Sequence, residues 1–246
     1  MKPLLVRFRS VVLAVMAIAF SLTVVANAAD APKPTGKQAS VEQYPIETFI
    51  DTLGVSGASF SADESKILFS SNKSGIWNAY SIPFKGGDWT PITRSTTDNH
   101  YAVAYFPGDD RVLVTSDQGG NELNHLFVVD SAGKLKDLTP GEKLKAQFSG
   151  FSHDGKQFFV TTNERDPKFF DLYRYDSESY QRELIYKNTD GYFPGTLSPD
   201  QKWLALGKTR NTNDSDIYVA NLASGKTSKI TEHAGNASFD EQDFSA

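Results

Sequence analysis

The sequence contains no cysteine. This absence excludes a disulfide framework, a zinc site built on thiolates, a cysteine nucleophile and a lipid anchor attached through cysteine. Histidine is scarce, and none of the four histidines has a second histidine or a carboxylate at a metal-ligand spacing, so we expect no metal site. A phosphate-binding loop is missing as well, and we expect no cofactor.

Positive charge and long apolar runs are also in short supply. The 246 residues carry 25 basic and 30 acidic side chains, a net charge of −5. A basic start, an apolar run over residues 11–25 and the small residues Ala26 and Ala28 are typical of a secretory signal peptide. We therefore expect a signal peptide at 1–28, an N-terminal segment at 29–52, and a protein exported to the periplasm or the extracellular space.

Without the first 28 residues, the chain has 22 basic against 30 acidic side chains, a net charge of −8. This acidic balance disfavours a nucleic-acid partner. No later apolar run approaches the roughly 18 residues that cross a bilayer, so we expect no stable membrane insertion after cleavage. An uncleaved anchor is the alternative interpretation of residues 11–25, and the sequence leaves the oligomeric state open.

What the sequence does contain is an internal repeat. A hydrophobic residue followed by a polar turn with an aspartate stands between two β-prone runs in each copy. The hydrophobic residues are Phe60, Phe106, Phe151 and Leu197, and the aspartates, spaced by 46, 45 and 46, are Asp63, Asp109, Asp154 and Asp200. We expect these carboxylates to accept N–H groups of their turns, and Gly155 to occupy a position with positive φ.

Two further landmarks keep nearly the same period. The first is a strand with a central aromatic residue, at Tyr80, Phe127, Tyr173 and Tyr218. The second is a closing strand, at Ile92, Leu138, Leu184 and Ile230. Four short antiparallel strands per repeat, with no amphipathic helix, predict an all-β fold: an incomplete β-propeller of about four four-stranded blades in which each blade buries the face of the next.

The period also sets the expected organisation of the chain. A partial propeller is expected over 53–246, with repeats at about 53–96, 97–142, 143–188 and 189–234. Residues 235–246 restart the phrase at Phe244, so we expect a fifth blade to begin there and the sequence to be the front part of a longer protein.

Several stretches resemble one family. They are residues 55–61, 117–126 (DQGGNELNHL), 162–173 (TNERDPKFFDLY) and 197–200 (LSPD). Over about residues 45–246 the sequence resembles the N-terminal propeller of exported prolyl oligopeptidase family serine peptidases, of the dipeptidyl aminopeptidase and acylaminoacyl peptidase type. The resemblance implies a propeller that caps an α/β-hydrolase domain and admits only short peptides. It also implies that the catalytic Ser, Asp and His belong to that domain, which follows the propeller and is absent here.

The residues themselves offer no catalytic group. Gly54 to Ala58 comes nearest to the Gly-x-Ser-x-Gly elbow of a hydrolase, but Ala58 replaces the last glycine and no helix pattern follows. Ser152, His153 and Asp154 are adjacent in a blade turn, whereas a triad needs groups that converge in space. Residues 213–216 lack the glycine and the glutamate of a calcium loop and predict a solvated turn. We expect this chain alone to be inactive.

Charged loop residues are the candidates for substrate contact. Glu122, Glu164 and Arg165 could face the central tunnel and grip the terminal amine or carboxylate of a peptide, against an alternative structural or exposed role. The resemblance implies short peptide substrates, bound together with the missing hydrolase domain, and a role in proteolysis. The alternative function is that of a TolB-like periplasmic propeller that binds a protein on one rim, because the Ser-Pro-Asp turn also occurs there.

Overall fold

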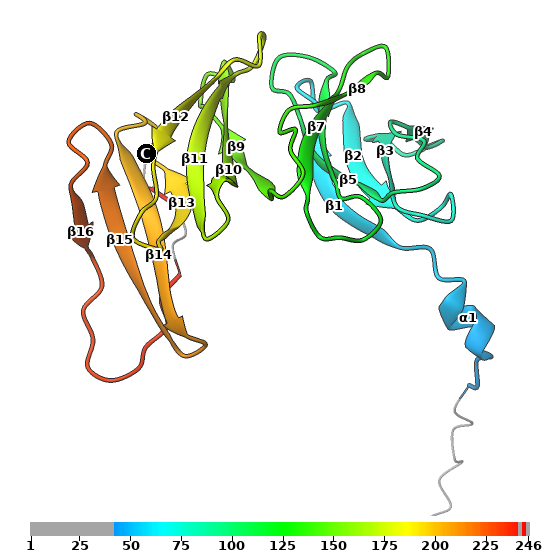
Figure 1. The fold of residues 1–246 in the computed structure, drawn as a ribbon. Coiled ribbons are helices and arrows are strands. Elements are labelled where there is room, and N and C mark those ends of the chain that lie inside the picture. Colours follow the sequence, from blue (N-terminus) through cyan, green and yellow to red (C-terminus); the bar gives the residue numbers. More distant parts are fainter. Residues whose placement is uncertain (1–41, 241–242, 245–246) are drawn as a thin grey trace, which may run out of the picture. The chain divides into compact units, whose positions relative to one another are not determined.

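The computed structural model describes residues 42–240 and 243–244. A short helix, α1 (Ile46–Ile50), precedes a series of strands that runs to Lys229 (Figure 1). No helix in the described part is long and apolar enough to cross a membrane. The signal peptide predicted at 1–28 lies outside the described residues.

The strands form antiparallel sheets of four, each built from consecutive strands in sequence order. The first sheet consists of β1 (Val55–Phe60), β2 (Lys66–Ser71), β3 (Asn78–Pro83) and β4 (Thr90–Pro91). The second consists of β5 (His100–Tyr105), β6 (Val112–Ser116), β7 (His125–Val129) and β8 (Leu135–Asp137). The third consists of β9 (Ala146–Phe151), β10 (Gln157–Asp166), β11 (Phe169–Asp176) and β12 (Arg182–Tyr186). The fourth consists of β13 (Phe193–Leu197), β14 (Trp203–Asn211), β15 (Asp214–Asn221) and β16 (Thr227–Lys229). The predicted all-β fold of four-stranded blades is confirmed, and we number the sheets blade 1 to blade 4.

The strand register confirms the aromatic landmark. Each landmark aromatic on the third strand pairs with the residue on the second strand that lies two positions after the partner of Phe60, Tyr105, Phe151 or Leu197. The pairs are Phe69 with Tyr80, Val114 with Phe127, Val160 with Tyr173, and Leu206 with Tyr218. The four aromatic residues are therefore structurally equivalent.

The same register corrects two other alignments. Tyr105, not Phe106, ends the first strand of blade 2, because Tyr105 pairs with Val112 as Phe60 pairs with Ile67. Asp109 therefore stands one residue later in its turn than the other three aspartates.

The second correction concerns the closing strand of blade 3. Leu184 pairs directly with Tyr173, whereas in blade 1 the partner of Tyr80 is Pro91 and Ile92 follows it. The counterpart of Ile92 is therefore Ile185, which packs against the core, while Leu184 is 39% exposed. Arg182 to Leu184 pair regularly with Tyr175 to Tyr173, and a register shift follows between Tyr173 and Leu172.

The aspartates hold their turns as predicted. Backbone N–H groups donate to the carboxylates of Asp63, Asp109, Asp154 and Asp200, over distances of 2.8 to 3.1 Å. In three turns a serine hydroxyl donates to the same carboxylate at 2.7 Å. Gly155 has φ of +70°, as expected for the turn.

Antiparallel strand order divides the connections into two groups. Connections between first and second strands, and between third and fourth strands, leave the sheets at what we call the turn side. Connections between second and third strands, and the crossovers between blades, leave at what we call the loop side. The loop side comprises residues 72–77, 92–99, 117–124, 138–145, 167–168, 187–192, 212–213 and 230–240. A hydrogen bond from Gly119 N to Asp98 Oδ1 (2.8 Å) joins two of these segments from neighbouring blades.

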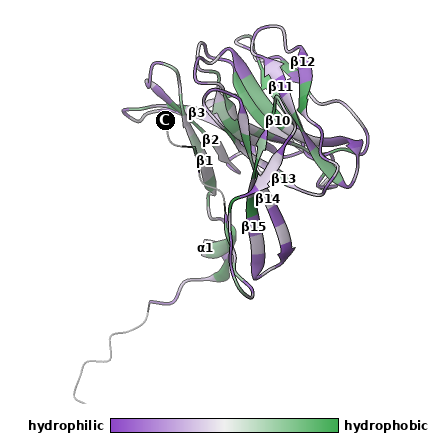
Figure 2. Ribbon diagram, turned by 90° about the vertical axis from the view of Figure 1, so that its left-hand side faces the viewer, coloured by the Kyte–Doolittle hydropathy of each residue, from purple (hydrophilic) through white to green (hydrophobic). Residues whose placement is uncertain are grey.

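The hydrophobic core lies between neighbouring blades. One cluster, around Leu68, Val112 and Val129, joins blades 1 and 2. A larger one, around Phe106, Leu126 and Phe158, joins blades 2 and 3, and a third joins blades 3 and 4. In Figure 2 the hydrophobic colour accordingly lies on strands such as β10 and β11, and the hydrophilic colour on turns and loops.

The expected start of a fifth blade falls on residues 235–246, of which 235–240 and 243–244 are described and contain no strand. Ser215 N donates to Ala237 O (3.0 Å), and Phe239 N donates to Ser215 Oγ (2.8 Å). At the equivalent position of blade 1, Trp77 O accepts a hydrogen bond from His100 N at the start of β5 (2.9 Å). Residues 237 and 239 are thus hydrogen-bonded to the start of β15, and the start of a fifth blade stays a prediction.

Candidate functional site

All three predicted contact residues lie at or next to the loop side. Glu122 belongs to the β6–β7 loop, and Glu164 and Arg165 belong to the end of β10. The topology therefore brings to one side of the blades the residues that the sequence singled out for gripping a peptide.

Glu122 is the one of the three whose side chain has no partner within the described residues. Its φ of +59° is unusual for a residue other than glycine, and its backbone N–H donates to Asp117 Oδ2 (2.8 Å). Its carboxylate is exposed and has no hydrogen bond or ion pair within the described residues. The backbone of the loop is fixed, while the charge at its tip is available to a ligand.

Glu164 is engaged with its neighbours. Arg182 Nη1 donates to its Oε2 (2.7 Å), and the guanidinium of Arg182 lies 5.0 Å from the centre of the Tyr173 ring. Burial, together with a hydrogen bond to Glu164, raises the pKa of the Tyr173 hydroxyl to about 12. Tyr173 therefore stays neutral at physiological pH and donates a hydrogen bond to the Glu164 side chain.

Arg165 is held by a buried carboxylate. Its Nε and Nη2 donate to the two oxygens of Asp171, at 2.5 and 2.8 Å, and Nη2 also donates to Asn188 O (2.6 Å). The Asp171 side chain is fully buried. A bidentate pair of this kind satisfies a buried charge and fixes the geometry of both partners, so Arg165 clamps the β10–β11 hairpin to the segment after β12.

The Asp171 position recurs in every blade. Two residues before each landmark aromatic stands a buried polar side chain that bonds to the fourth strand or to the segment just after it. The four residues are Asn78, His125, Asp171 and Asp216. Asn78 Oδ1 accepts from Thr93 Oγ1 (2.8 Å), and His125 Nδ1 lies 2.8 Å from Asp137 Oδ2. The sequence analysis missed this series, although its spacing equals that of the aromatic residues.

The solvated turn predicted at 213–216 is wrong. Asp214 is 6% and Asp216 is 1% exposed, and both belong to β15. Asp216 forms ion pairs with Arg210 and Lys229, and Thr231 Oγ1 donates to it at 2.8 Å. The hydrogen bond from Lys229 is the main cause that lowers the pKa of Asp216 to about 2. The cations that compensate the buried charge of Asp216 lie on the neighbouring strands β14 and β16. A motif of four consecutive residues could therefore not reveal them.

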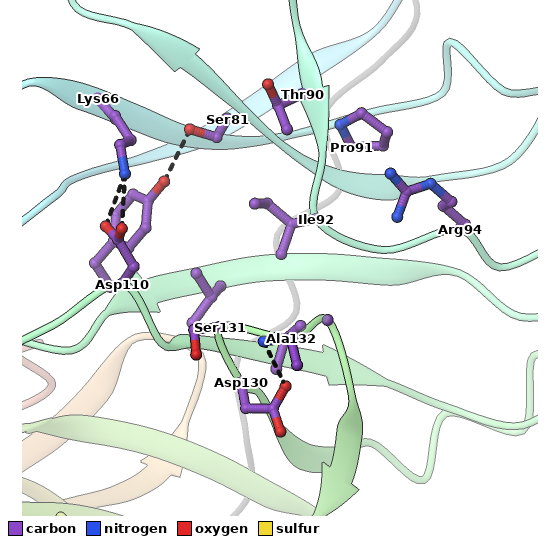
Figure 3. Close-up of a pocket in the computed structure, with 14 residues that line it drawn as sticks. Lys66, Ser81, Thr90, Pro91, Ile92, Arg94, Asp110, Asp130, Ser131 and Ala132 are labelled. Carbon is purple, nitrogen blue, oxygen red and sulfur yellow. Dashed lines mark hydrogen bonds and ion pairs between the residues drawn. The ribbon is translucent and has the colours of Figure 1, made fainter.

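A cavity of about 450 Å³ lies between blades 1 and 2 on the turn side (Figure 3). Its polar groups largely satisfy one another: Lys66 Nζ contacts Asp110 Oδ1 (2.8 Å), Tyr105 Oη donates to Ser81 Oγ (2.8 Å), and Asp130 accepts from the N–H of Ala132 (3.0 Å). The first two interactions join the two blades, and of the charged lining residues only Arg94 has no hydrogen bond or ion pair within the described residues. The loop side remains the candidate site.

Comparison with known proteins points to propellers. The chain is 26% identical, over 271 aligned positions, to dipeptidyl aminopeptidase BIII from Pseudoxanthomonas mexicana. The alignment covers 88% of this chain and 39% of that protein, so the chain spans about two fifths of the length of this curated relative. No model of a known protein family matches the sequence.

Two solved structures show the same fold. TolB from Acinetobacter baumannii matches 72% of this chain with a TM-score of 0.52 and 22% identity, over 43% of its own length. A prolyl endopeptidase matches 75% of this chain with a TM-score of 0.56 and 15% identity, over 30% of its own length. The chain is thus a distant homologue of a dipeptidyl aminopeptidase and has a propeller fold that TolB and prolyl endopeptidases share.

Proposed function

We propose that this chain is the propeller segment of an exported serine peptidase, where it restricts access to short peptides while a separate α/β-hydrolase domain cleaves them. The observation that carries the proposal is the alignment with dipeptidyl aminopeptidase BIII, which runs along 88% of this chain but only 39% of the relative. The fold supports it, because a prolyl endopeptidase contains the same arrangement of blades.

The contacts of the two serine-containing segments considered in the sequence agree with this division of labour. Ser152 and Asp154 are bonded to each other inside the β9–β10 turn (2.7 Å), which leaves that serine without a base. Gly54 to Ala58 leads into β1 rather than into a helix. We assign the binding surface to this chain and acyl transfer to the second domain.

The first test is an activity assay on the purified chain with aminoacyl and dipeptidyl chromogenic substrates. We expect no hydrolysis. Hydrolysis that copurifies with the chain and is abolished by a serine-directed phosphonate would contradict the division of labour.

The second test asks whether the loop side contacts the substrate. In the full-length gene product, Glu122→Gln should lower kcat/KM for peptides with a free N-terminal amine several-fold, because it removes an unpaired carboxylate at the proposed entry. Glu64→Gln is the matched control, since Glu64 has a φ of +55° and an exposed side chain but lies on the turn side. Equal effects of the two substitutions would count against gating from the loop side.

A TolB-like binding module is the second candidate function, favoured by the match to TolB. It predicts a stable stoichiometric partner in a pull-down from envelope extract, and no hydrolase domain in the gene. The fold alone does not separate the two functions, because propellers of one architecture carry unrelated activities.

A further inference from the structure

A second cavity, of about 420 Å³, lies at the loop side between blades 2 and 3. Residues of the first strands of the two blades, β5 and β9, and Phe170 at the start of β11 line it. Its apolar lining includes Leu126, which is 1% exposed, and the partly buried Tyr101, Val103, Phe148 and Phe170. A space of this size, with an aromatic lining, suits one large apolar side chain and the adjoining backbone of a ligand.

The polar groups around this cavity differ from those of the cavity between blades 1 and 2. Within the described residues, the Lys145 ammonium, the side-chain amides of Asn124 and Gln147 and the Tyr101 hydroxyl form no hydrogen bond or ion pair. Lys145 is the one charged residue of the lining. An apolar space bordered by a few unsatisfied polar groups is the usual form of a ligand site.

The backbone holds the lysine at this position. Lys145 N donates to Asn163 Oδ1 (2.6 Å), and Asn163 N donates to Lys145 O (3.3 Å). Ala146 N, the next residue, donates to Asn124 O (2.7 Å). The crossover is therefore fixed to the β6–β7 loop and to β10, so the cost of ordering it is already met before a ligand binds.

We propose that this cavity binds the C-terminal residue of a short peptide, with an aromatic or large aliphatic side chain among the rings and the terminal carboxylate on Lys145. The Asn124 and Gln147 amides would hydrogen-bond the preceding peptide unit. The inference deepens the proposed function and rests on it for the identity of the ligand as a peptide. It adds a substrate class: short peptides with a free, hydrophobic C-terminus.

Binding to the purified chain tests the proposal without any hydrolysis. By isothermal titration calorimetry, N-acetyl-Gly-Phe should bind at least fivefold more tightly than both its C-terminal amide and N-acetyl-Gly-Gly. Lys145→Gln should abolish the preference for the acid over the amide and leave binding of the amide unchanged. Lys143→Gln, two residues away and exposed, is the matched control and should change nothing. Lys145→Arg should retain the preference.

The outcomes separate the cavity from the proposed function. Equal affinity for acid and amide, or an unchanged preference in Lys145→Gln, overturns the cavity assignment even if the full-length protein is a peptidase. Selective binding that depends on Lys145 supports the cavity assignment even if the gene encodes no hydrolase, and in that case the proposed function alone fails.

Discussion

The turn aspartates show how a single side chain can fix a blade. In the turn of blade 4, Ser198 Oγ and Lys202 N both donate to Asp200 Oδ1, at 2.7 and 3.1 Å. The bond from Ser198 is the largest cause that lowers the pKa of Asp200 to about 2, followed by the bonds from the Lys202 ammonium, 3.0 Å from Oδ2, and from the Lys202 N–H. The unfolded carboxyl has a pKa of about 3.9. Asp200 therefore stabilises the fold above about pH 4, and this contribution is lost as the pH falls towards 2.

Ser198→Ala should raise the pKa of Asp200 towards the ordinary value of about 3.9, because it removes the strongest hydrogen bond to the ionised form. The pKa is measured by NMR titration of the carboxyl carbons. Ser149→Ala, which changes an exposed serine with no hydrogen bond in the described residues, is the control. An unchanged pKa of Asp200 in Ser198→Ala would refute the assigned cause.

The Arg165 pair predicts an effect on stability rather than on binding alone. Arg165→Ala leaves the buried Asp171 carboxylate without its bidentate partner, so the urea midpoint of unfolding should fall clearly. The midpoint of Arg165→Lys should lie between those of the unsubstituted protein and Arg165→Ala, because an ammonium group cannot donate to both carboxylate oxygens in the geometry of the guanidinium. Arg94→Ala, at an exposed arginine with no partner in the described residues, should stay within about 0.5 kcal/mol. Equal midpoints for Arg165→Ala and Arg94→Ala would show that the clamp contributes nothing.

For single residues, the sequence predicted the interactions between side chains and backbone groups that are close in the chain. The carboxylates of Asp63, Asp154 and Asp200 accept N–H groups within two residues, and residue types at fixed spacing reveal such turns. The partners of Asp171 and Asp216 lie on other strands or in the segments that follow them, up to 17 residues away. Their burial could therefore not be foreseen from a four-residue stretch.

Strands and turns are the elements in which neighbouring blades meet. The β9–β10 turn packs against blade 2, because a Cβ added to Gly155 would lie 2.9 Å from Cβ of Pro107. The β15–β16 turn has a glycine of nearly the same conformation, Gly225 with φ of +69°, around which nothing lies within 4 Å.

These two glycines give a matched pair of substitutions. Gly225→Ala should cost about 1–2 kcal/mol in the free energy of unfolding, the usual penalty for a left-handed residue with a Cβ. Gly155→Ala should cost more, because it adds the clash with Pro107 to the same penalty. Urea denaturation of both variants measures the difference. If the two costs are equal, the turn of blade 3 does not contact blade 2.

The elements themselves were predictable, and their exact register was not. Period, turn residues and aromatic positions predicted four strands per repeat. The similar sequences of the repeats aligned Asp109 and Leu184 one residue away from their structural places, because a displacement of one residue does not change the composition of a segment.

For the whole molecule, stability should depend on the seams between blades, since each blade contacts its neighbours. Phe158 lies in the seam between blades 2 and 3 and is fully buried. The centre of its ring is 4.9 Å from that of Tyr175 and 5.8 Å from that of Phe106. Phe158→Ala should cost about 3–5 kcal/mol in the free energy of unfolding. Leu184→Ala, at an exposed side chain, should cost less than about 1 kcal/mol. A small effect of Phe158→Ala in urea denaturation would show that this seam is not the core.

The function is the part that the fold leaves most open. The shared architecture of TolB and a prolyl endopeptidase shows that the blades alone do not select an activity. The choice between peptidase and binding module rests on whether the gene encodes an α/β-hydrolase domain.

The most direct measurement is therefore the nucleotide sequence of the gene downstream of the codon for Ala246. Our account predicts that the reading frame continues through further repeats of about 46 residues into a strand, a Gly-x-Ser-x-Gly turn and a helix. A stop codon immediately after Ala246, or a frame that ends without such an elbow, would contradict the peptidase assignment.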